Sequence, residues 1–247
     1  MPLTLYHIPH SPWSYKARCA LAHHGLTANL VEYTPFVDEP ALRLRIARNG
    51  GSFWGRITVP VLFTGDAVVR DSWEIARYAD RQGDAPRLIP FDDRETVAEW
   101  NRRSELFLDA GRARFTLRVL QHDEALRELS PPALTNLPLA LQRAAVRQFA
   151  SKYGMQADQE TRHRTIMREQ MLAMRDALSG DRSYLCGDFT YADVAMVAAL
   201  RTIKPEPGSS FGPHCEALLA DLELAQEFSD VIAYRDRMGE LHGPTLA

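Results

Sequence analysis

The sequence predicts a small mixed α/β domain followed by a larger all-helical domain. Three observations predict this fold class. Within residues 1–83 the hydrophobic periodicity changes between that of strands and that of helices several times over short distances. Residues 84–91 carry two prolines outside any periodic pattern and indicate a linker. In residues 92–247 strand signals cease and only helical periodicity remains.

The first elements form a strand, a helix and a second strand. Residues 3–6 alternate leucines with more polar side chains, as a strand does. In residues 13–24 apolar side chains recur every three to four positions, and Gly25 supplies a left-handed stop. Residues 28–33 are typical of another strand. Two strands joined through a helix are expected to be parallel, with a right-handed crossover.

The rest of this domain predicts one short helix, a hairpin and a longer helix. A weak helical pattern covers residues 42–47. Residues 59–63 and 67–70 read as antiparallel strands around a turn at residues 64–66. Ser72 then stands at the position expected for the N-cap of a helix.

The second domain is expected to be built from long helices. Thr190 precedes the most apolar of them, and Asp193 stands three residues later, which fits a capping box with Asp in place of the usual Glu. The helical segments are expected at about residues 93–129, 132–153, 158–179, 191–203 and 215–239.

Composition and charge exclude several classes of function. The 247 residues carry 29 Lys and Arg against 32 Asp and Glu, a formal net charge of −3, without a basic arm. Nucleic-acid binding therefore lacks its usual electrostatic signature. No apolar run is long enough to span a membrane and no signal peptide opens the chain, so we expect a cytoplasmic protein. Three widely spaced cysteines predict reduced thiols, and no metal site is expected.

The first candidate site lies at the start of the first helix. Ser11 is placed to cap this helix, and Pro12 occupies its first turn, where a missing N–H costs nothing. An anion bound there would meet free backbone N–H groups, the positive end of the helix dipole and the Ser11 hydroxyl. The alternative is that this Ser-Pro pair merely begins a helix.

The second and third candidates are Val59-Pro60 and Asp71-Ser72. Pro60 stands at the start of a strand, which indicates an edge or a deliberately exposed backbone. If the bond between them is cis, Val59 turns its N–H and C=O outward toward an extended ligand; a trans proline at a strand end is the alternative. Asp71 and Ser72 offer a helix N-terminus and a hydroxyl to a carboxylate, and an acid to an ammonium group. Alone, this pair is only a cap.

Taken together, these motifs resemble a cytosolic-type glutathione transferase over essentially the whole chain. The resemblance rests on Thr58-Val59-Pro60, Asp71-Ser72 and the residues 190–193. The segment 11–14, Ser-Pro-Trp-Ser, is similar to the active-site segment of the family's serine and cysteine branches, with a zeta/omega-like serine type. This resemblance implies a thioredoxin-like N-terminal α/β domain, an all-α C-terminal domain, and glutathione as co-substrate.

The resemblance also implies a role for each matching residue. Ser11 would donate a hydrogen bond to the glutathione sulfur. Val59 would pair through its backbone with the cysteinyl part, with Pro60 as the cis proline behind it. Asp71 and Ser72 would hold the γ-glutamyl end.

Further implications concern the second substrate and the assembly. A small hydrophobic electrophile would lie against Trp13 and aromatics such as Phe107 or Phe115, which are alternatively core residues. A homodimer is implied. The group that holds the glycyl carboxylate stays open among four arginines: Arg43, Arg45, Arg48 and Arg56.

Departures from the family pattern limit the reaction. Both cysteine positions of a redox-active C-x-x-C are serines here, Ser11 and Ser14, so the reactive sulfur must come from the ligand. The S-S-C-S segment of isomerase-type relatives is absent, which leaves maleylacetoacetate isomerisation unsupported. Three interpretations stay open: a transferase that conjugates glutathione, a glutathione-dependent lyase or reductase on the same scaffold, and a noncatalytic binding protein.

Overall fold

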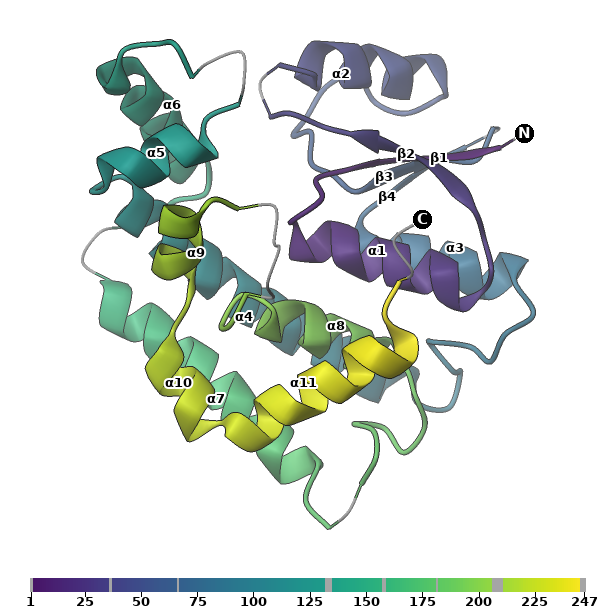
Figure 1. Ribbon diagram of the computed structural model, residues 1–247. Coiled ribbons are helices and arrows are strands. Elements are labelled where there is room, and N and C mark those ends of the chain that lie inside the picture. Colours follow the sequence, from purple (N-terminus) through teal and green to yellow (C-terminus); the bar gives the residue numbers. More distant parts are fainter. Residues whose placement is uncertain are drawn as a thin grey trace. The chain divides into compact units, whose positions relative to one another are not determined.

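The structure is a computed structural model whose contacts divide the chain into two compact units (Figure 1). It describes residues 2–35, 37–65, 67–131, 135–156, 159–180, 182–205 and 211–244. The first unit comprises residues 1–101, 184–198 and 237–247, and the second comprises residues 102–183 and 199–236.

The first unit contains a four-stranded mixed sheet. Its strands are β1 (Leu3–His7), β2 (Ala28–Glu32), β3 (Val61–Phe63) and β4 (Val68–Arg70), in the order β2-β1-β3-β4. The β1–β2 pair is parallel, as the strand-helix-strand pattern predicts, and β3–β4 is the predicted antiparallel hairpin. This arrangement confirms the predicted fold class, a thioredoxin-like α/β domain.

Helices cover both faces of this sheet. Helices α1 (Pro12–His23) and α3 (Ser72–Gln82) lie side by side on one face, and α2 (Glu39–Arg48) lies on the other (Figure 1). Small residues of α1 and α3 are fully buried, so the two helices approach closely. Ile46 anchors α2 in a core with residues of β3, and its complete burial contributes about 1.5–3 kcal/mol.

Two expectations for this unit need correction. The first strand of the hairpin begins later than expected, because β3 starts at Val61 and leaves Val59-Pro60 just outside it. The expected N-cap Ser72 is wrong: Asp71 is the N-cap of α3, and Ser72 is its first helical residue. Residue 66 of the expected turn lies outside the described residues.

A buried carboxylate ties the end of α3 to the start of the predicted linker. Asp80 Oδ1 accepts hydrogen bonds from His24 Nε2 and from the Leu88 N–H, both at 2.8 Å. Its Oδ2 accepts from the Ile89 N–H at 2.9 Å. Gly83 follows α3, and a Cβ there would lie 2.4 Å from the His24 Cβ. The chain therefore leaves the sheet along one defined path.

The elements in the remaining described residues are helices, as predicted. The helices are α4 (Arg94–Val119), α5 (Asp123–Leu129), α6 (Leu139–Lys152), α7 (Glu160–Ala177), α8 (Tyr191–Leu200), α9 (Pro213–Leu219), α10 (Leu222–Glu227) and α11 (Ser229–His242). Across the described ranges, no helix is long and apolar enough to cross a membrane.

Two of the expected long helices are divided. The segment 93–129 forms α4 and α5, because His122 begins a new helix by accepting from the Ala125 N–H. The segment 215–239 forms three helices, with the Asp221 side chain capping α10. The expected starts at 132 and 158 lie outside the described residues.

The predicted capping box of α8 is confirmed in the first unit. Asp193 Oδ2 accepts from the Thr190 N–H at 2.8 Å, and Thr190 Oγ1 accepts from the Ala192 N–H at 3.3 Å. Asp193 Oδ1 also accepts from the Leu185 N–H at 2.9 Å. The N–H groups of Leu185, Thr190 and Ala192 thus find acceptors in two side chains, and the Tyr191 N–H donates to the Leu88 C=O at 2.8 Å.

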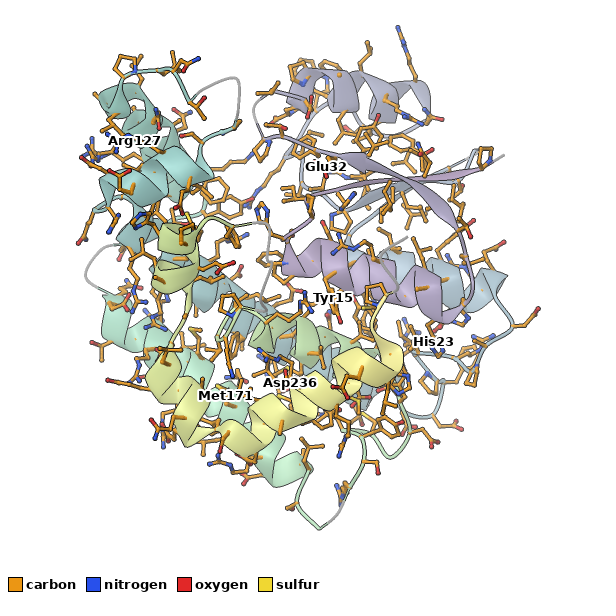
Figure 2. The ribbon with its side chains drawn as sticks, viewed as in Figure 1. Tyr15, His23, Glu32, Arg127, Met171 and Asp236 are labelled. Carbon is orange, nitrogen blue, oxygen red and sulfur yellow. The ribbon has the colours of Figure 1, made fainter. Side chains whose placement is uncertain are left out.

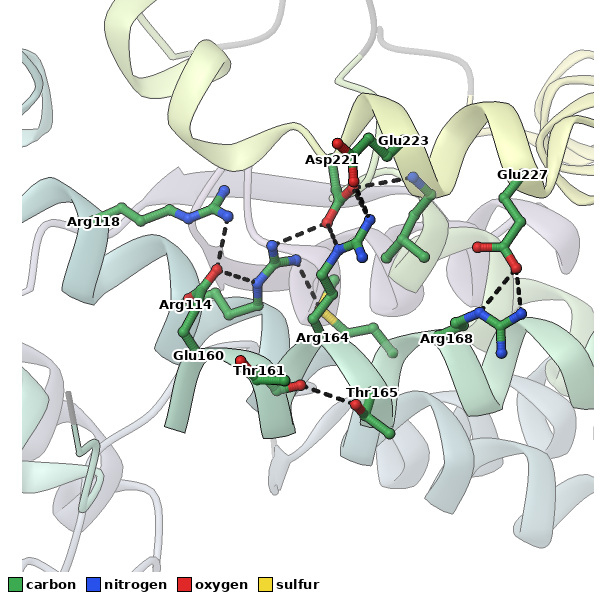
Figure 3. A network of polar contacts seen from close by, with 12 residues as sticks. Arg114, Arg118, Glu160, Thr161, Arg164, Thr165, Arg168, Asp221, Glu223 and Glu227 are labelled. Carbon is green, nitrogen blue, oxygen red and sulfur yellow. Dashed lines mark hydrogen bonds and ion pairs between the residues drawn. The ribbon is translucent and has the colours of Figure 1, made fainter. Parts of the chain in front are cut away.

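In the second unit a row of arginines along α7 pairs with acids of α10, of the residue before it and of the start of α11; Figure 3 draws the pairs of Arg164 and Arg168. Arg164, Arg168 and Arg175 are spaced so that they share one helix face. Each pairs with an acid from the segment 221–230. The row therefore holds α10 in place, although few residues of α10 are buried.

The most buried part of this network lies around Asp221 (Figure 3). Its Oδ2 is 2.9 Å from Arg114 Nη2 and 2.9 Å from Arg164 Nε. Burial works to raise the pKa of the Asp221 carboxyl, but hydrogen bonds from Arg164 and the Leu224 N–H, together with Arg114, lower that pKa to about 2. This carboxylate stays ionised over the whole physiological range.

Candidate active site

The sheet register brings the predicted site residues to one end of the sheet. Tyr6 of β1 pairs with Val61 of β3, and Val61 pairs with Arg70 of β4. One step beyond this row lie Pro60, which precedes Val61, and Asp71, which follows Arg70. The loop from β1 to α1 leaves from the same end. Three segments that are distant in sequence therefore converge there.

Ser11 begins α1 with a hydroxyl that the helix does not use. Its backbone is extended (φ −73°, ψ 125°), and its side chain makes no capping hydrogen bond. Its N–H donates to the Ile8 C=O at 3.0 Å, and its C=O accepts from the Tyr15 N–H at 2.9 Å. Pro12 occupies the first helical turn, as predicted. The first turn contains no acidic residue, so nothing there repels an anion.

Ser14, the other serine of the segment, has a structural role. Its side chain is fully buried, and its Oγ accepts a hydrogen bond from the Ile8 N–H at 3.1 Å. Cys19 forms no disulfide and is buried within α1. Ser11, in contrast, precedes the helix, and its side chain makes no capping hydrogen bond.

The Val59–Pro60 peptide bond is cis. Val59 is half-buried and packs against the core beside β3. Its N–H and C=O make no hydrogen bond to another backbone group in the part of the chain that the structure describes. An extended segment of backbone could pair with these two groups.

Asp71 combines a cap with an unusual backbone conformation. Its φ is +79°, a value that residues other than glycine rarely adopt, and its Oδ1 accepts from the Trp73 N–H at 2.8 Å. Such backbone strain costs about 1–3 kcal/mol and tends to occur at functional sites. Asp71 is exposed, whereas Ser72 is buried.

Two of the four candidate arginines are engaged within the fold. Arg43 Nη1 donates to the C=O groups of Phe53 and Gly55, at 2.6 and 2.9 Å. Arg45 Nη1 donates to the Tyr6 hydroxyl at 2.8 Å, and its guanidinium stacks on the Tyr6 ring at 5.2 Å. Arg43 thus supports the loop before β3, and Arg45 covers the sheet.

The other two candidates are exposed. Arg48 is the last residue of α2, and Arg56 lies three residues before Val59. Of the four, Arg56 is nearest in sequence to the unpaired backbone of Val59.

The aromatic candidates differ in exposure. Trp13 is half-buried in the first turn of α1. Phe107 is fully buried in the second unit. Phe115 packs against the core of that unit, with its ring 5.4 Å from that of Phe211. The two phenylalanines therefore serve as core side chains there.

Sequence reasoning missed two residues of this site, His7 and Arg18. Arg18 Nη1 lies 2.9 Å from His7 Nδ1, and Arg18 Nη2 donates to the Pro9 C=O at 3.0 Å. Burial, and then the neighbouring Arg18, lower the pKa of His7; Glu32, its partner on β2 (labelled in Figure 2), opposes them. The signal for His7 was its place in β1, on the same buried face as Leu5.

Comparison with known proteins identifies the fold. Residues 10–82 match the family model of the glutathione S-transferase N-terminal domain. No curated protein sequence matches the chain.

Several solved structures are similar over nearly the whole chain. The β-etherase LigF from Sphingobium sp. strain SYK-6 has a TM-score of 0.65 at 18% identity and covers 97% of this chain and 95% of that one. A glutathione S-transferase from Methylobacterium radiotolerans, in complex with glutathione sulfonate, has a TM-score of 0.62 at 21% identity, with coverage of 97% and 91%. A glutathione transferase family member from Pseudomonas fluorescens, with bound glutathione, has a TM-score of 0.62 at 18% identity, with coverage of 99% and 100%.

Proposed function

We propose a function from the premise that this chain carries a glutathione S-transferase N-terminal domain on a glutathione-transferase fold: it binds glutathione as a thiolate and conjugates it to a small hydrophobic electrophile. The observation that carries the proposal is the Ser11 hydroxyl at the N-terminus of α1, unused by the helix. Solved neighbours that hold glutathione or its sulfonate support the choice of ligand.

The proposed binding mode follows the end of the sheet. The glutathione sulfur lies at Ser11, and the cysteinyl backbone pairs with Val59 beside the cis Pro60. The γ-glutamyl end lies at the start of α3, where Ser72 supplies the helix N-terminus and Asp71 a carboxylate for its ammonium group.

The energy needed to ionise the thiol is within reach of these groups. A free thiol titrates near pH 8.5, and lowering its pKa by one unit requires about 1.36 kcal/mol. One charge-assisted hydrogen bond contributes about 1.5–3 kcal/mol, and a helix N-terminus about 0.3–1 kcal/mol. Ser11 and α1 together can therefore lower the pKa of the thiol by about one to three units.

In the proposed reaction Ser11 is a hydrogen-bond donor and neither nucleophile nor base. The thiolate sulfur attacks an electrophilic carbon and forms a thioether bond. The electron pair of the broken bond leaves with a halide or alkoxide. With an activated alkene, the π electron pair instead moves to the neighbouring carbon, which then takes a proton from water. Trp13 supplies an apolar surface for the electrophile.

A glutathione-dependent lyase is the second candidate function. The likeness to a β-etherase favours it, because an aryl ether is also an electrophile that a thiolate can cleave. The two candidates share the binding site and differ in the second substrate.

The test begins with calorimetric titration of glutathione into the purified protein. We expect saturable heat, and its absence would contradict the proposal. Incubation with glutathione and an aryl halide, an epoxide or an aryl ether then identifies the reaction. A thioether product from the halide or epoxide supports conjugation, release of a phenol from the ether supports the lyase, and oxidised glutathione indicates a reductase.

The proposal extends to the assembly and the compartment. We place the protein in the cytoplasm as a homodimer, on the basis of the family resemblance. Sedimentation of the purified protein measures its oligomeric state, and a molecular mass of one chain would contradict the homodimer.

A further inference from the structure

Arg18 lies in the second turn of α1, seven residues after Ser11, which precedes the helix as its N-cap. Helical side chains lean toward the N-terminus, so the long Arg18 side chain runs back along the helix toward its start. Its guanidinium accordingly reaches His7 and Pro9, which precede Ser11 in the loop.

The guanidinium holds this loop through two divergent hydrogen bonds. Nη1 binds His7 Nδ1 at 2.9 Å, and Nη2 binds the Pro9 C=O at 3.0 Å. These bonds join the end of β1 to the turn before the helix. The Ser11 N–H closes the same turn on the Ile8 C=O. The position of the Ser11 hydroxyl is therefore set by a loop that Arg18 fixes.

The chemistry of the contact requires His7 to be neutral. A guanidinium has only donors, so the Nδ1 atom of His7 must accept and carries no proton. His7 is buried, and burial disfavours its charged form. The imidazole of His7 and the C=O of Pro9 are both neutral acceptors.

The contact also places a cation where helix electrostatics disfavours it. The N-terminal end of a helix is positive, and cations are stabilised at the other end. A guanidinium held beside the turn that opens α1 therefore adds to an existing positive potential. A negative charge at Ser11 is stabilised by both. Functional sites typically contain such departures from the usual preference of cations for the C-terminal end of a helix.

We propose that Arg18 is a positioning residue for the ionised thiol: its fork fixes the loop that presents Ser11, and its charge adds to the potential of the helix N-terminus. This inference rests on the proposed function, since the anion it serves is the glutathione thiolate. His7 contributes the neutral acceptor that orients the Arg18 guanidinium.

The test measures thiol ionisation in the complex by the ultraviolet absorbance of the thiolate as a function of pH. Arg18→Gln is expected to raise the midpoint by about one unit, a tenfold loss of thiolate at a fixed lower pH. Arg81→Gln, at the far end of α3, removes one helix arginine from the same unit and is expected to leave the midpoint unchanged. An unchanged midpoint in Arg18→Gln, with glutathione still bound, would overturn the proposal.

A second pair of variants separates the hydrogen bond from the fold. In His7→Asn the amide Oδ1 stands at the same number of bonds from the backbone as the imidazole Nδ1 and can accept from Arg18. We expect it to shift the midpoint by less than about a third of the Arg18→Gln shift. His7→Leu keeps an apolar core but removes the acceptor, and is expected to approach Arg18→Gln. Equal pH midpoints of thiolate formation in the two His7 variants would refute a role for the hydrogen bond between Arg18 and His7.

These outcomes are distinct from failure of the proposed function. Absence of saturable glutathione binding by the unchanged protein contradicts the proposed function itself. Binding with an ionised thiol that is indifferent to Arg18 and His7 contradicts only the positioning role.

Discussion

Two serines of one short segment illustrate how a shared residue type acquires different roles. Ser11 keeps its hydroxyl free of the helix, whereas the Ser14 hydroxyl is buried and accepts from the Ile8 N–H. The difference follows from position, because Ser11 precedes the first turn and Ser14 lies inside it. Only the first can meet a ligand at the positive end of the helix.

The roles of Ser11 and Ser72 can be separated by experiment. Ser11→Ala is expected to keep glutathione affinity within a few-fold and to raise the pH midpoint of thiolate formation, because it removes one donor to the sulfur. Ser72→Ala is expected to weaken binding and leave the midpoint in place, since Ser72 lies at the other end of the ligand. Calorimetry gives the affinity and ultraviolet absorbance the midpoint. An unmoved midpoint in Ser11→Ala would refute Ser11 as the donor.

Asp71 carries a cap, a strained backbone and a charge, which substitutions can separate. Asn caps helices as well as Asp does and tolerates positive φ, so Asp71→Asn should change the free energy of unfolding by less than about 0.5 kcal/mol. Losing the charge should weaken glutathione binding about tenfold or more, because a charge-assisted hydrogen bond contributes about 1.5–3 kcal/mol. Asp71→Ala should also lose about 1 kcal/mol of stability with the cap. Equal affinity of Asp71→Asn and the unchanged protein would contradict the ammonium contact.

At the scale of elements, ion pairs between helices differ widely in what they contribute. Asp221 is buried between Arg114 and Arg164, whereas Glu223, which also pairs with Arg164, is 87% exposed. Exposed pairs contribute about 0–1 kcal/mol because water screens them. Removing one partner of a buried pair costs about 3–5 kcal/mol.

Acid unfolding tests this difference. The pKa of Asp221 is lowered from 3.8 to about 2, so its contribution is fully present above pH 3.8 and is lost as the pH falls toward 2. The shift corresponds to about 2 kcal/mol. We expect Asp221→Asn, which keeps the cap, to lower the free energy of unfolding at neutral pH. Below pH 4, the free energy of unfolding of this variant should fall less steeply with pH than that of the unchanged protein. Glu223→Gln is the control. If urea unfolding shows that both variants lose the same free energy of unfolding, the larger contribution of the buried Asp221 carboxylate is contradicted.

The structure also shows which contacts sequence reasoning can reach. Signals confined to one segment were sufficient for the Ser11 helix start, the Gly25 stop and the Asp193 capping box. The cap of α3 was misplaced by one residue, because Asp71 and Ser72 are both good caps and stand side by side. Arg18 was missed because its partners lie on another element, and no periodicity in one segment reports a contact between two.

Considered as a whole molecule, the chain places all the residues proposed to bind glutathione in one compact unit. That unit is assembled from three separate stretches of sequence, which include most of α8 and the end of α11. A ligand bound to the folded unit and not to the unfolded chain therefore opposes the unfolding of all three stretches together.

Thermal unfolding measures this coupling. Glutathione at 100 times its Kd should stabilise the protein by about 2.7 kcal/mol. For a chain of this size that corresponds to a rise in Tm of about 5–10 °C. Ser72→Ala at the same glutathione concentration should show a smaller rise. A Tm that does not depend on glutathione concentration would contradict binding to the folded state.

One ring contact joins the proposed γ-glutamyl pocket to a helix far away in sequence. Trp73 follows Ser72, and its ring meets the buried ring of Tyr191 edge-on, 5.4 Å between centroids, where α8 begins. Tyr191 in turn follows the capping residue Thr190. We therefore expect a replacement of Thr190 or Asp193 to displace the Trp73 ring and to weaken binding of the γ-glutamyl end of glutathione, although neither residue is proposed to touch the ligand.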